Sequence, residues 1–210
     1  MSDRLVGQRR EQWIRLPVDT PAGGWRAWGE RLADQLPPAG TLQVSCGDQS
    51  PLEVGCLAAL RQCRRGWISS GRSWQWQDLD PAVSCAFDFL GLHRSDAPTG
   101  LPFVGRPRFD DAIDVVFQPS GGVAFDLLIA LAWLPGVRFD RLEVDVGKLD
   151  HFTSQIINWL LKIRANGVQV HLLRPNNRVI TVIEQMRLDR LFRLTREVRP
   201  TEAPQIDQQG

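Results

Sequence analysis

The chain is poor in the residues that most often carry chemistry. It has three histidines, four cysteines and no tyrosine among 210 residues. The cysteines form no C-x-x-C pair, which argues against a zinc site or a redox motif, so we interpret them as small buried apolar residues. None of the motifs G-x-S-x-G, G-x-x-x-x-G-K, G-x-G-x-x-G or H-E-x-x-H occurs. The sequence therefore predicts a protein that is not an enzyme and binds no metal or cofactor.

The chain also lacks long apolar runs and an excess of charge of either sign. No apolar stretch approaches the roughly 20 residues that a membrane-spanning helix needs, and residues 1–10 lack the apolar core of a signal peptide. The formal net charge is +1, and acidic and basic residues nearly balance in each half. Nucleic-acid binding needs a concentrated basic patch. We therefore expect a cytoplasmic protein with no membrane span and no nucleic-acid partner.

What the chain does contain is an internal repeat with an offset of 100 residues. The stretch Leu142–Ile163 is predicted to form a strand, a short turn and a helix, and Leu42–Cys63 repeats it. The paired positions are Leu42 with Leu142, Val44 with Val144, Gly47 with Gly147 and Leu60 with Leu160. Such a repeat favours two small domains. We predict a first domain over residues 1–94, a Pro- and Gly-rich linker over 95–108, a second domain over 109–199 and a disordered tail over 200–210.

Each repeat is predicted to alternate strands and helices three times. Strands are expected over 13–18, 42–46 and 74–77 in the first repeat, and over 113–118, 142–146 and 168–173 in the second. Alternation of this kind predicts right-handed crossovers and an α/β fold, in which each domain has a small, mostly parallel sheet with helices packed against it. Two similar units in one chain can also pack on each other as an internal pseudo-dimer.

The apolar faces of the helices follow from residue spacing. For the helix after the first strand of each repeat, the expected faces are Trp25, Trp28, Leu32 and Leu36, and Phe125, Leu128, Ile129, Ala132 and Trp133. Trp74 and Trp76 alternate along one strand and share a face, where they either pack on the helices or line an interface. A closing helix is predicted to carry Arg187, Arg190, Arg193, Arg196 and Arg199, either as a solvated face or as a contact for an acidic partner.

Four segments of the second repeat carry a family resemblance. They are Val144–Val146, the hydroxyl-bearing helix start Thr153–Ser154, Val168–Pro175 and the closing Leu188–Phe192. In this order they resemble the STAS domain, the fold of bacterial anti-anti-sigma factors and of the cytosolic tails of sulfate transporters. The resemblance covers residues 110–194 and extends through the repeat to 12–94. It implies two tandem STAS-like domains, and a regulatory or scaffold protein that acts through protein–protein contacts without catalysis.

The resemblance also singles out the start of the central helix. There STAS domains carry Asp-Ser/Thr-x-Gly, and a partner kinase phosphorylates the hydroxyl. The second repeat reads Phe152-Thr-Ser-Gln155, so the Asp and the Gly are missing, but Thr153 fits the phosphoacceptor position and Ser154 follows it. The first repeat has Glu53 in place of the hydroxyl and keeps the glycine, Gly55. The resemblance makes Thr153 and Ser154 the phosphoacceptor candidates. It implies a partner-binding surface formed by Phe152, Thr153, Ser154 and Gln155, with Leu52, Glu53, Val54 and Gly55 as its first-repeat counterpart.

Both helix starts also have a simpler interpretation. A Ser or Thr at this position caps free backbone N–H groups, and a Glu there interacts favourably with the helix dipole. Phosphate on Thr153 would instead place nearly two negative charges on a surface that a partner must cover. The sequence leaves the cap and the switch both open.

Three functions follow from these interpretations. The first is regulation through a kinase or a sigma-regulatory protein. The second, favoured somewhat by the missing Asp and Gly, is a phosphorylation-independent STAS subunit of a membrane transporter of the ABC lipid-transport type, which contacts its ATPase. The third is an enzyme or small-ligand binder that uses the turns Gly23-Gly24 and Gly121-Gly122. We expect the first.

Overall fold

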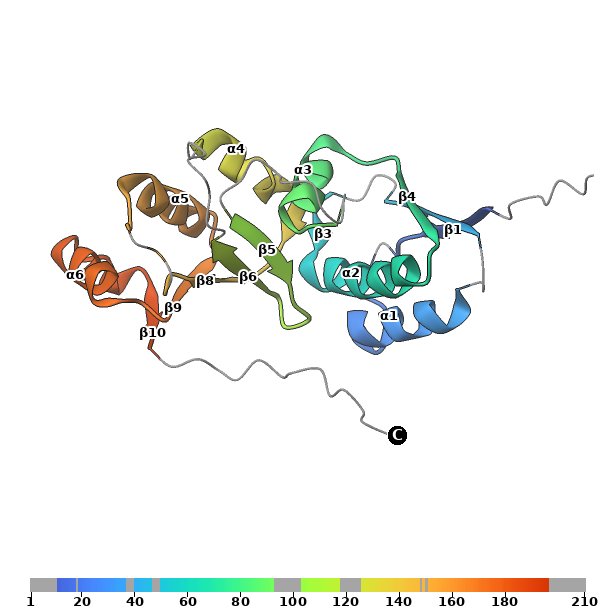
Figure 1. Cartoon of the computed structure of the whole chain (residues 1–210), viewed down its shortest axis with the longest axis horizontal. Helices are drawn as coiled ribbons and strands as arrows, with labels where there is room; N and C mark the ends of the chain where they lie inside the picture. Colours follow the sequence, from blue (N-terminus) through green and yellow to red (C-terminus); the bar gives the residue numbers. More distant parts are fainter. Residues whose placement is uncertain are drawn as a thin grey trace, which may run out of the picture.

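Strands and helices alternate along most of the described chain (Figure 1). The structure is a computed structural model that describes residues 11–17, 19–36, 40–46, 50–92, 103–117, 126–147, 149 and 151–196. The predicted tail over 200–210 and the turn Gly121-Gly122 lie outside these residues. The described strands form two larger sheets and one two-stranded sheet. The predicted α/β class with parallel sheets is therefore confirmed.

The first half contains a three-stranded parallel sheet with the order β1-β2-β4. Its strands are β1 (Glu11–Arg15), β2 (Thr41–Ser45) and β4 (Ser73–Gln77), and its helices are α1 (Gly24–Gln35), α2 (Val54–Ser69) and α3 (Pro81–Phe89). Trp74 and Trp76 share a face as predicted, and the Trp76 ring packs against Phe87 of α3 with a centroid distance of 4.5 Å. α2 is the most enclosed helix, since α1 covers one side of it and strand β5 of the second half another.

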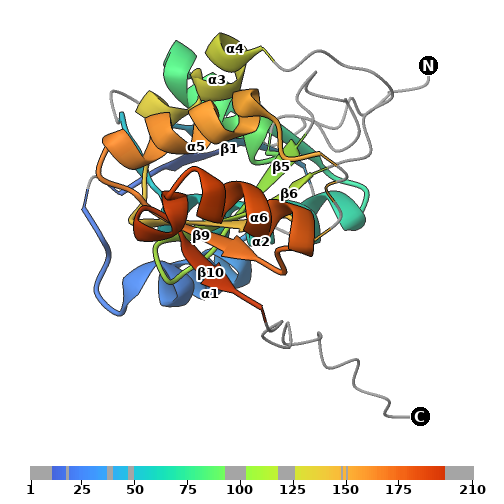
Figure 2. The same ribbon diagram turned by 90° about the vertical axis from the view of Figure 1, so that its left-hand side faces the viewer.

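The second half contains a five-stranded sheet with the order β10-β9-β8-β6-β5. Four of its strands run parallel, and β5 is antiparallel to β6. The strands are β5 (Phe103–Pro107), β6 (Ala112–Phe117), β8 (Arg141–Asp145), β9 (Gln169–Leu173) and β10 (Arg193–Thr195). The helices are α4 (Leu127–Leu131), α5 (Ser154–Ala165) and α6 (Asn177–Gln185). α5 and α6 lie side by side (Figures 1 and 2), and the side chains of Leu142, Val144, Val170 and Leu172 form the buried apolar rows of this sheet.

Three short elements complete the described chain. β3 (Leu52–Glu53) pairs in parallel with β7 (Val137–Arg138) and so joins the two halves. Two 3-10 helices, η1 (Leu134–Gly136) and η2 (Leu188–Arg190), precede β7 and β10. None of these elements, nor β5 and β10, is predicted from the sequence.

The structure corrects the predicted linker and the predicted closing helix. Residues 103–107 of the linker 95–108 form the edge strand β5, so the second sheet begins before residue 109. α6 ends at Gln185, and Arg187 then adopts a left-handed backbone with φ 53°, which ends the helical path. Arg190 consequently belongs to η2 and Arg193 to β10.

The two halves share one continuous core, in which aromatic rings meet at the junction. Phe89 of α3 stacks on Trp133 with a centroid distance of 4.0 Å, and Phe103 of β5 packs on Trp159 of α5 at 4.6 Å. Gly136 allows η1 to approach α3, because a Cβ there would overlap the backbone of Ala82. The two repeats therefore pack directly on each other.

This junction is not that of a symmetric pseudo-dimer. In a symmetric pair both copies of an element would lie at the contact. Here α3 contacts η1 and β5, whereas α6, its counterpart in the repeat, lies at the far end of the molecule (Figure 1). The halves contact each other through different surfaces, head to tail.

Candidate functional site

The α5 entrance, residues Phe152–Gln155, is the exposed part of the predicted partner surface. α5 begins at Ser154, and Thr153 is its N-cap, because Thr153 Oγ1 accepts a hydrogen bond from the backbone N–H of Ile156 at 3.4 Å. Thr153, Ser154 and Gln155 are exposed, while Phe152 is half-buried and packs against the core. The interpretation of Thr153 as a helix cap is confirmed. Its exposure also leaves it accessible to a partner.

Side-chain hydrogen bonds hold the described part of the loop that leads to the α5 entrance. Asp145, the last residue of β8, accepts from the N–H of Gly147 at 3.1 Å and forms an ion pair with Arg174, which follows β9. Asn176 donates to the carbonyl oxygen of Leu149 at 2.9 Å and also caps α6. The starts of α5 and α6 are thus connected at the carboxyl edge of the sheet.

An exposed apolar pair lies on α4, beside α5. The side chains of Leu128 and Ile129 are 81% and 55% exposed. Their prediction as core residues is wrong, because α4 has five residues and turns Ala130 inward instead. The Ala130 carbonyl oxygen accepts from the indole N–H groups of Trp133 and of Trp159 on α5, at 2.8 and 3.0 Å. The pair therefore extends the exposed surface next to the first turns of α5.

The α2 entrance, residues Leu52–Gly55, is closed. Leu52 and Val54 are 3% and 0% exposed, and Gly55 is also buried. A Cβ on Gly55 would lie 2.6 Å from the Trp25 ring of α1, so the two helices meet at this glycine. β7 of the second half covers the entrance from the other side by pairing with β3. An outside partner cannot reach Leu52, Val54 or Gly55, which corrects their prediction as partner-binding residues.

Glu53, the counterpart of Thr153, is bonded within the first half. It is the N-cap residue of α2 but makes no side-chain cap bond. Its Oε2 instead accepts hydrogen bonds from Trp25 Nε1 at 2.5 Å and from Thr20 Oγ1 at 2.7 Å. These two bonds, the one from Trp25 above all, lower the pKa of Glu53, and Arg138 of β7 acts in the same direction. Glu53 therefore joins α1 to the start of α2.

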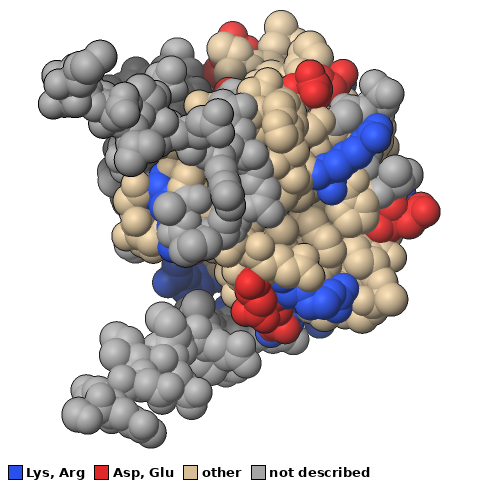
Figure 3. Space-filling view, turned by 90° about the vertical axis from the view of Figure 1, so that its right-hand side faces the viewer, with Lys and Arg blue, Asp and Glu red and all other residues tan. Residues whose placement is uncertain are grey.

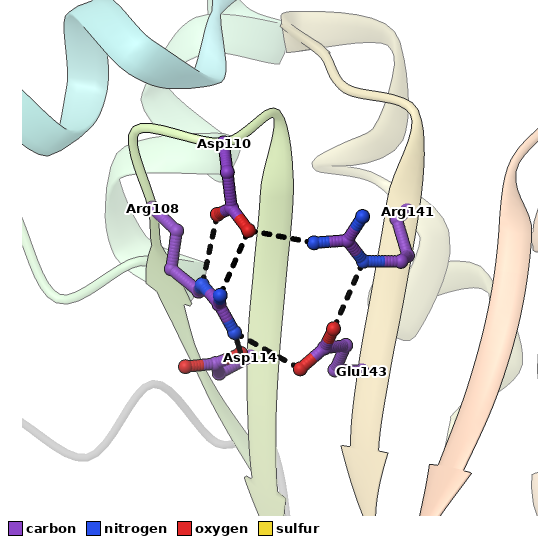
Figure 4. Close-up of polar contacts among 5 residues, drawn as sticks. All are labelled: Arg108, Asp110, Asp114, Arg141 and Glu143. Atoms are coloured by element: carbon purple, nitrogen blue, oxygen red, sulfur yellow. Dashed lines mark hydrogen bonds and ion pairs between the residues drawn. The ribbon is translucent and has the colours of Figure 1, made fainter. Parts of the chain in front are cut away.

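The densest group of charges in the described residues is a structural network on the second sheet (Figure 4). Arg108 binds both oxygens of Asp110 at 2.9 and 2.8 Å and also reaches Asp114 and Glu143. Arg141 bridges Asp110 and Glu143 at 2.7 and 2.9 Å. Burial raises the pKa of Asp114 although Arg108 opposes it, and at Asp110 the two arginines overcome burial and lower the pKa. Each carboxylate has an arginine partner, so the network stabilises the fold and presents no free acid or base.

The remaining side chains that could react or bind a metal, such as the cysteine thiols, form no cluster within the described residues. Burial raises the pKa of the Cys46 thiol to about 12 and that of Cys63 to about 11, which keeps both protonated and unreactive. Within the described residues, no cluster of His, Cys, Asp and Glu could hold a metal ion. None of the helices in the described ranges is long and apolar enough to cross a membrane.

A surface hollow lies at the carboxyl ends of β1, β2 and β4. It is wide, with a volume of about 830 Å³, and Trp13, Arg15, Ser45 and Asp78 are among its lining residues. Ser45 donates to Asp78 at 3.3 Å with no histidine between them, so the hollow lacks an activated nucleophile. On the face in Figure 3, which shows the first-half end, basic and acidic side chains are scattered rather than gathered by sign.

Comparisons of the chain with models of protein families, with curated proteins and with solved structures give no match.

Proposed function

We propose that the chain is a non-enzymatic regulatory or scaffold protein that binds another protein through the α5 entrance, in the manner of STAS-domain proteins of the anti-anti-sigma type. One observation carries this proposal. Of two helix starts at equivalent positions of a repeat, three of the four residues of the α2 entrance are buried and Glu53 is half-buried, whereas three of the four residues of the α5 entrance are exposed. A surface covered within the chain is not available to a partner, and the exposed copy is.

The fold of the second half supports the resemblance behind this proposal. The resemblance implies a mostly parallel sheet with helices against it over residues 110–194. β6, β8, β9 and β10 run parallel, and α5 and α6 lie on this sheet (Figure 1). The first half, with its closed entrance, serves as a built-in partner that supports the second.

In this proposal Thr153 is the switch of the surface. A phosphate on its hydroxyl would meet the free N–H groups and the positive dipole end of α5, so the helix tolerates the charge. A partner seated on Phe152–Gln155 would meet nearly two additional negative charges. Phosphorylation of Thr153 or of the neighbouring Ser154 would therefore change partner affinity more than stability.

A second candidate is the phosphorylation-independent STAS subunit of an ABC-type lipid transporter, in contact with its ATPase. The cap geometry favours it, because Thr153 Oγ1 already accepts from the N–H of Ile156 without a phosphate. The missing Asp and Gly point in the same direction. In this case the neutral hydroxyl itself is part of the contact.

Co-purification of the tagged chain from its native cells, with mass spectrometry and phosphosite mapping, tests both candidates. A kinase or sigma-regulatory protein together with phosphate on Thr153 or Ser154 supports the first, and an ATPase with no phosphate supports the second. The Thr153→Ala and Ser154→Ala variants should lose the partner or the phosphate. If both variants keep every partner and the wild type carries no phosphate, the switch is wrong.

A further inference from the structure

An open groove lies at the edge of the second sheet opposite to the α5 entrance. Its volume is about 520 Å³. The last turn of α5, the start of β9, η2 and β10 enclose it, and Figure 2 faces this end of the molecule. Arg164, His171, Asp189, Arg190, Leu191 and Arg193 are among the residues that line it. All of them belong to the described chain, and none belongs to the surface proposed above.

The groove has an excess of positive charge. Three arginines face one carboxylate, Asp189. Within the described residues, Arg164, Arg190 and Arg193 take part in none of the ion pairs, whereas Arg108, Arg141 and Arg174 of the same half each have a carboxylate partner. His171 adds no charge at neutral pH, because burial, together with Arg141 and Arg193, lowers its pKa. The positive charge of the groove therefore comes from guanidinium groups that are available to a ligand.

The exposed wall of the groove adds one apolar side chain, Leu191, to this charge. Val170 and Phe192 are buried, and Leu191 is 38% exposed. Guanidinium groups bind carboxylates through paired hydrogen bonds. Successive side chains of an extended peptide point to opposite sides, so a peptide of alternating acidic and apolar residues can turn its carboxylates toward the arginines and an apolar side chain toward Leu191. Three arginines with an acidic residue among them are too few for a nucleic-acid backbone, which needs a longer row of cations.

We propose that this groove binds an extended acidic segment of a protein partner. The proposal needs neither the α5 entrance nor phosphorylation. It gives the second half two binding surfaces at opposite edges of one sheet, so the chain can hold two proteins at once.

Fluorescence anisotropy with a labelled hexapeptide of alternating Glu and Val tests the proposal on the full chain. The charge reversals Arg190→Glu and Arg193→Glu should each weaken binding about five- to tenfold, since each removes a surface ion pair and adds a repulsion. The matched control is Arg178→Glu, an exposed arginine of α6 that does not line the groove. It should change the affinity less than about twofold.

Three results would overturn the proposal. One is an equal affinity of the wild type, the two groove variants and the control. Another is equal binding of a peptide in which Lys replaces Glu. The third is complete displacement of the acidic peptide by inorganic phosphate or by a short DNA duplex, which would identify a general anion site or a nucleic-acid site. Arg190→Gln removes the charge with less disturbance and should weaken binding in the same direction, and circular dichroism verifies that each variant is folded.

Discussion

The two helix entrances differ in what covers them. Both follow a parallel strand, both open a long helix, and their N-cap residues, Glu53 and Thr153, lie 100 positions apart. At the α2 entrance the neighbouring side chains are buried, and Trp25 and β7 enclose them. At the α5 entrance Thr153, Ser154 and Gln155 are exposed. The comparison teaches that one copy of the repeat is used to assemble the molecule, while the other copy keeps its helix entrance exposed.

The head-to-tail junction explains this difference. Since the halves meet through different surfaces, β7 of the second half covers the first entrance and no equivalent element covers the second within the described residues. Glu53 at the covered position serves as a fixed acceptor for Trp25 and Thr20.

The largest expected effect is the truncation of a buried side chain at the closed entrance. Leu52→Ala should lower the free energy of unfolding by about 2–5 kcal/mol, because it leaves a cavity between β3 and the core. Phe152→Ala at the open entrance should cost less, although it removes a larger side chain, because Phe152 is half-buried. Urea unfolding followed by tryptophan fluorescence measures both. Equal losses would remove the distinction between a closed and an open entrance.

A pair of glycine substitutions on α2 sharpens the same comparison. Gly55→Ala should cost about 1–3 kcal/mol, because the new methyl group collides with Trp25. Gly66→Ala on the same helix has no heavy atom within 4 Å of the new Cβ. It should stabilise the protein by about 0.5–1 kcal/mol through helix propensity. Thermal unfolding should therefore shift in opposite directions, and a stabilising Gly55→Ala would contradict the close packing of α1 on α2.

Of the two hydroxyl residues at the α5 entrance, only the cap residue Thr153 should contribute to the free energy of unfolding. Thr153→Ala should lower the free energy of unfolding by about 1 kcal/mol through loss of the bond to the Ile156 N–H, and Thr153→Ser should retain most of it. Ser154→Ala, at an exposed position, should stay within about 0.5 kcal/mol of the wild type. A larger loss from Ser154→Ala than from Thr153→Ala would contradict the assignment of Thr153 as the cap of α5.

The positions of the two helix entrances can be predicted from the sequence, but the difference in their burial cannot. A hydroxyl or an acid before an amphipathic stretch marks the cap, and the repeat fixes its partner, so residues 53 and 153 are both found. β5 escapes prediction because Pro and Gly surround it and Pro107 ends it, which an edge strand tolerates. The head-to-tail junction depends on contacts between distant segments, such as Phe89 with Trp133, that no local pattern records.

The smallest effect is a pH dependence at the closed entrance. Hydrogen bonds from Trp25 and Thr20 lower the pKa of Glu53 in the folded state. Its contribution to stability is fully present above its ordinary pKa and is lost as the pH falls through the folded value, because the unfolded chain takes up the proton first. Glu53→Gln should therefore destabilise the protein by under about 1 kcal/mol at neutral pH and by progressively less in acid. A difference between the two proteins that grows as the pH falls would have the wrong sign.

The central claim is that the partner binds the α5 entrance and not the exposed surface of the corresponding helix α2. Gln155 and Gln62 are exposed glutamines on α5 and α2, so Gln155→Arg and Gln62→Arg make the same change on the two corresponding helices. The most direct measurement is the amount of the partner recovered with each variant, relative to the wild type, in quantitative co-purification. We predict that Gln155→Arg loses most of the partner and that Gln62→Arg retains it. Full recovery with Gln155→Arg, or an equal loss with both variants, would contradict the account.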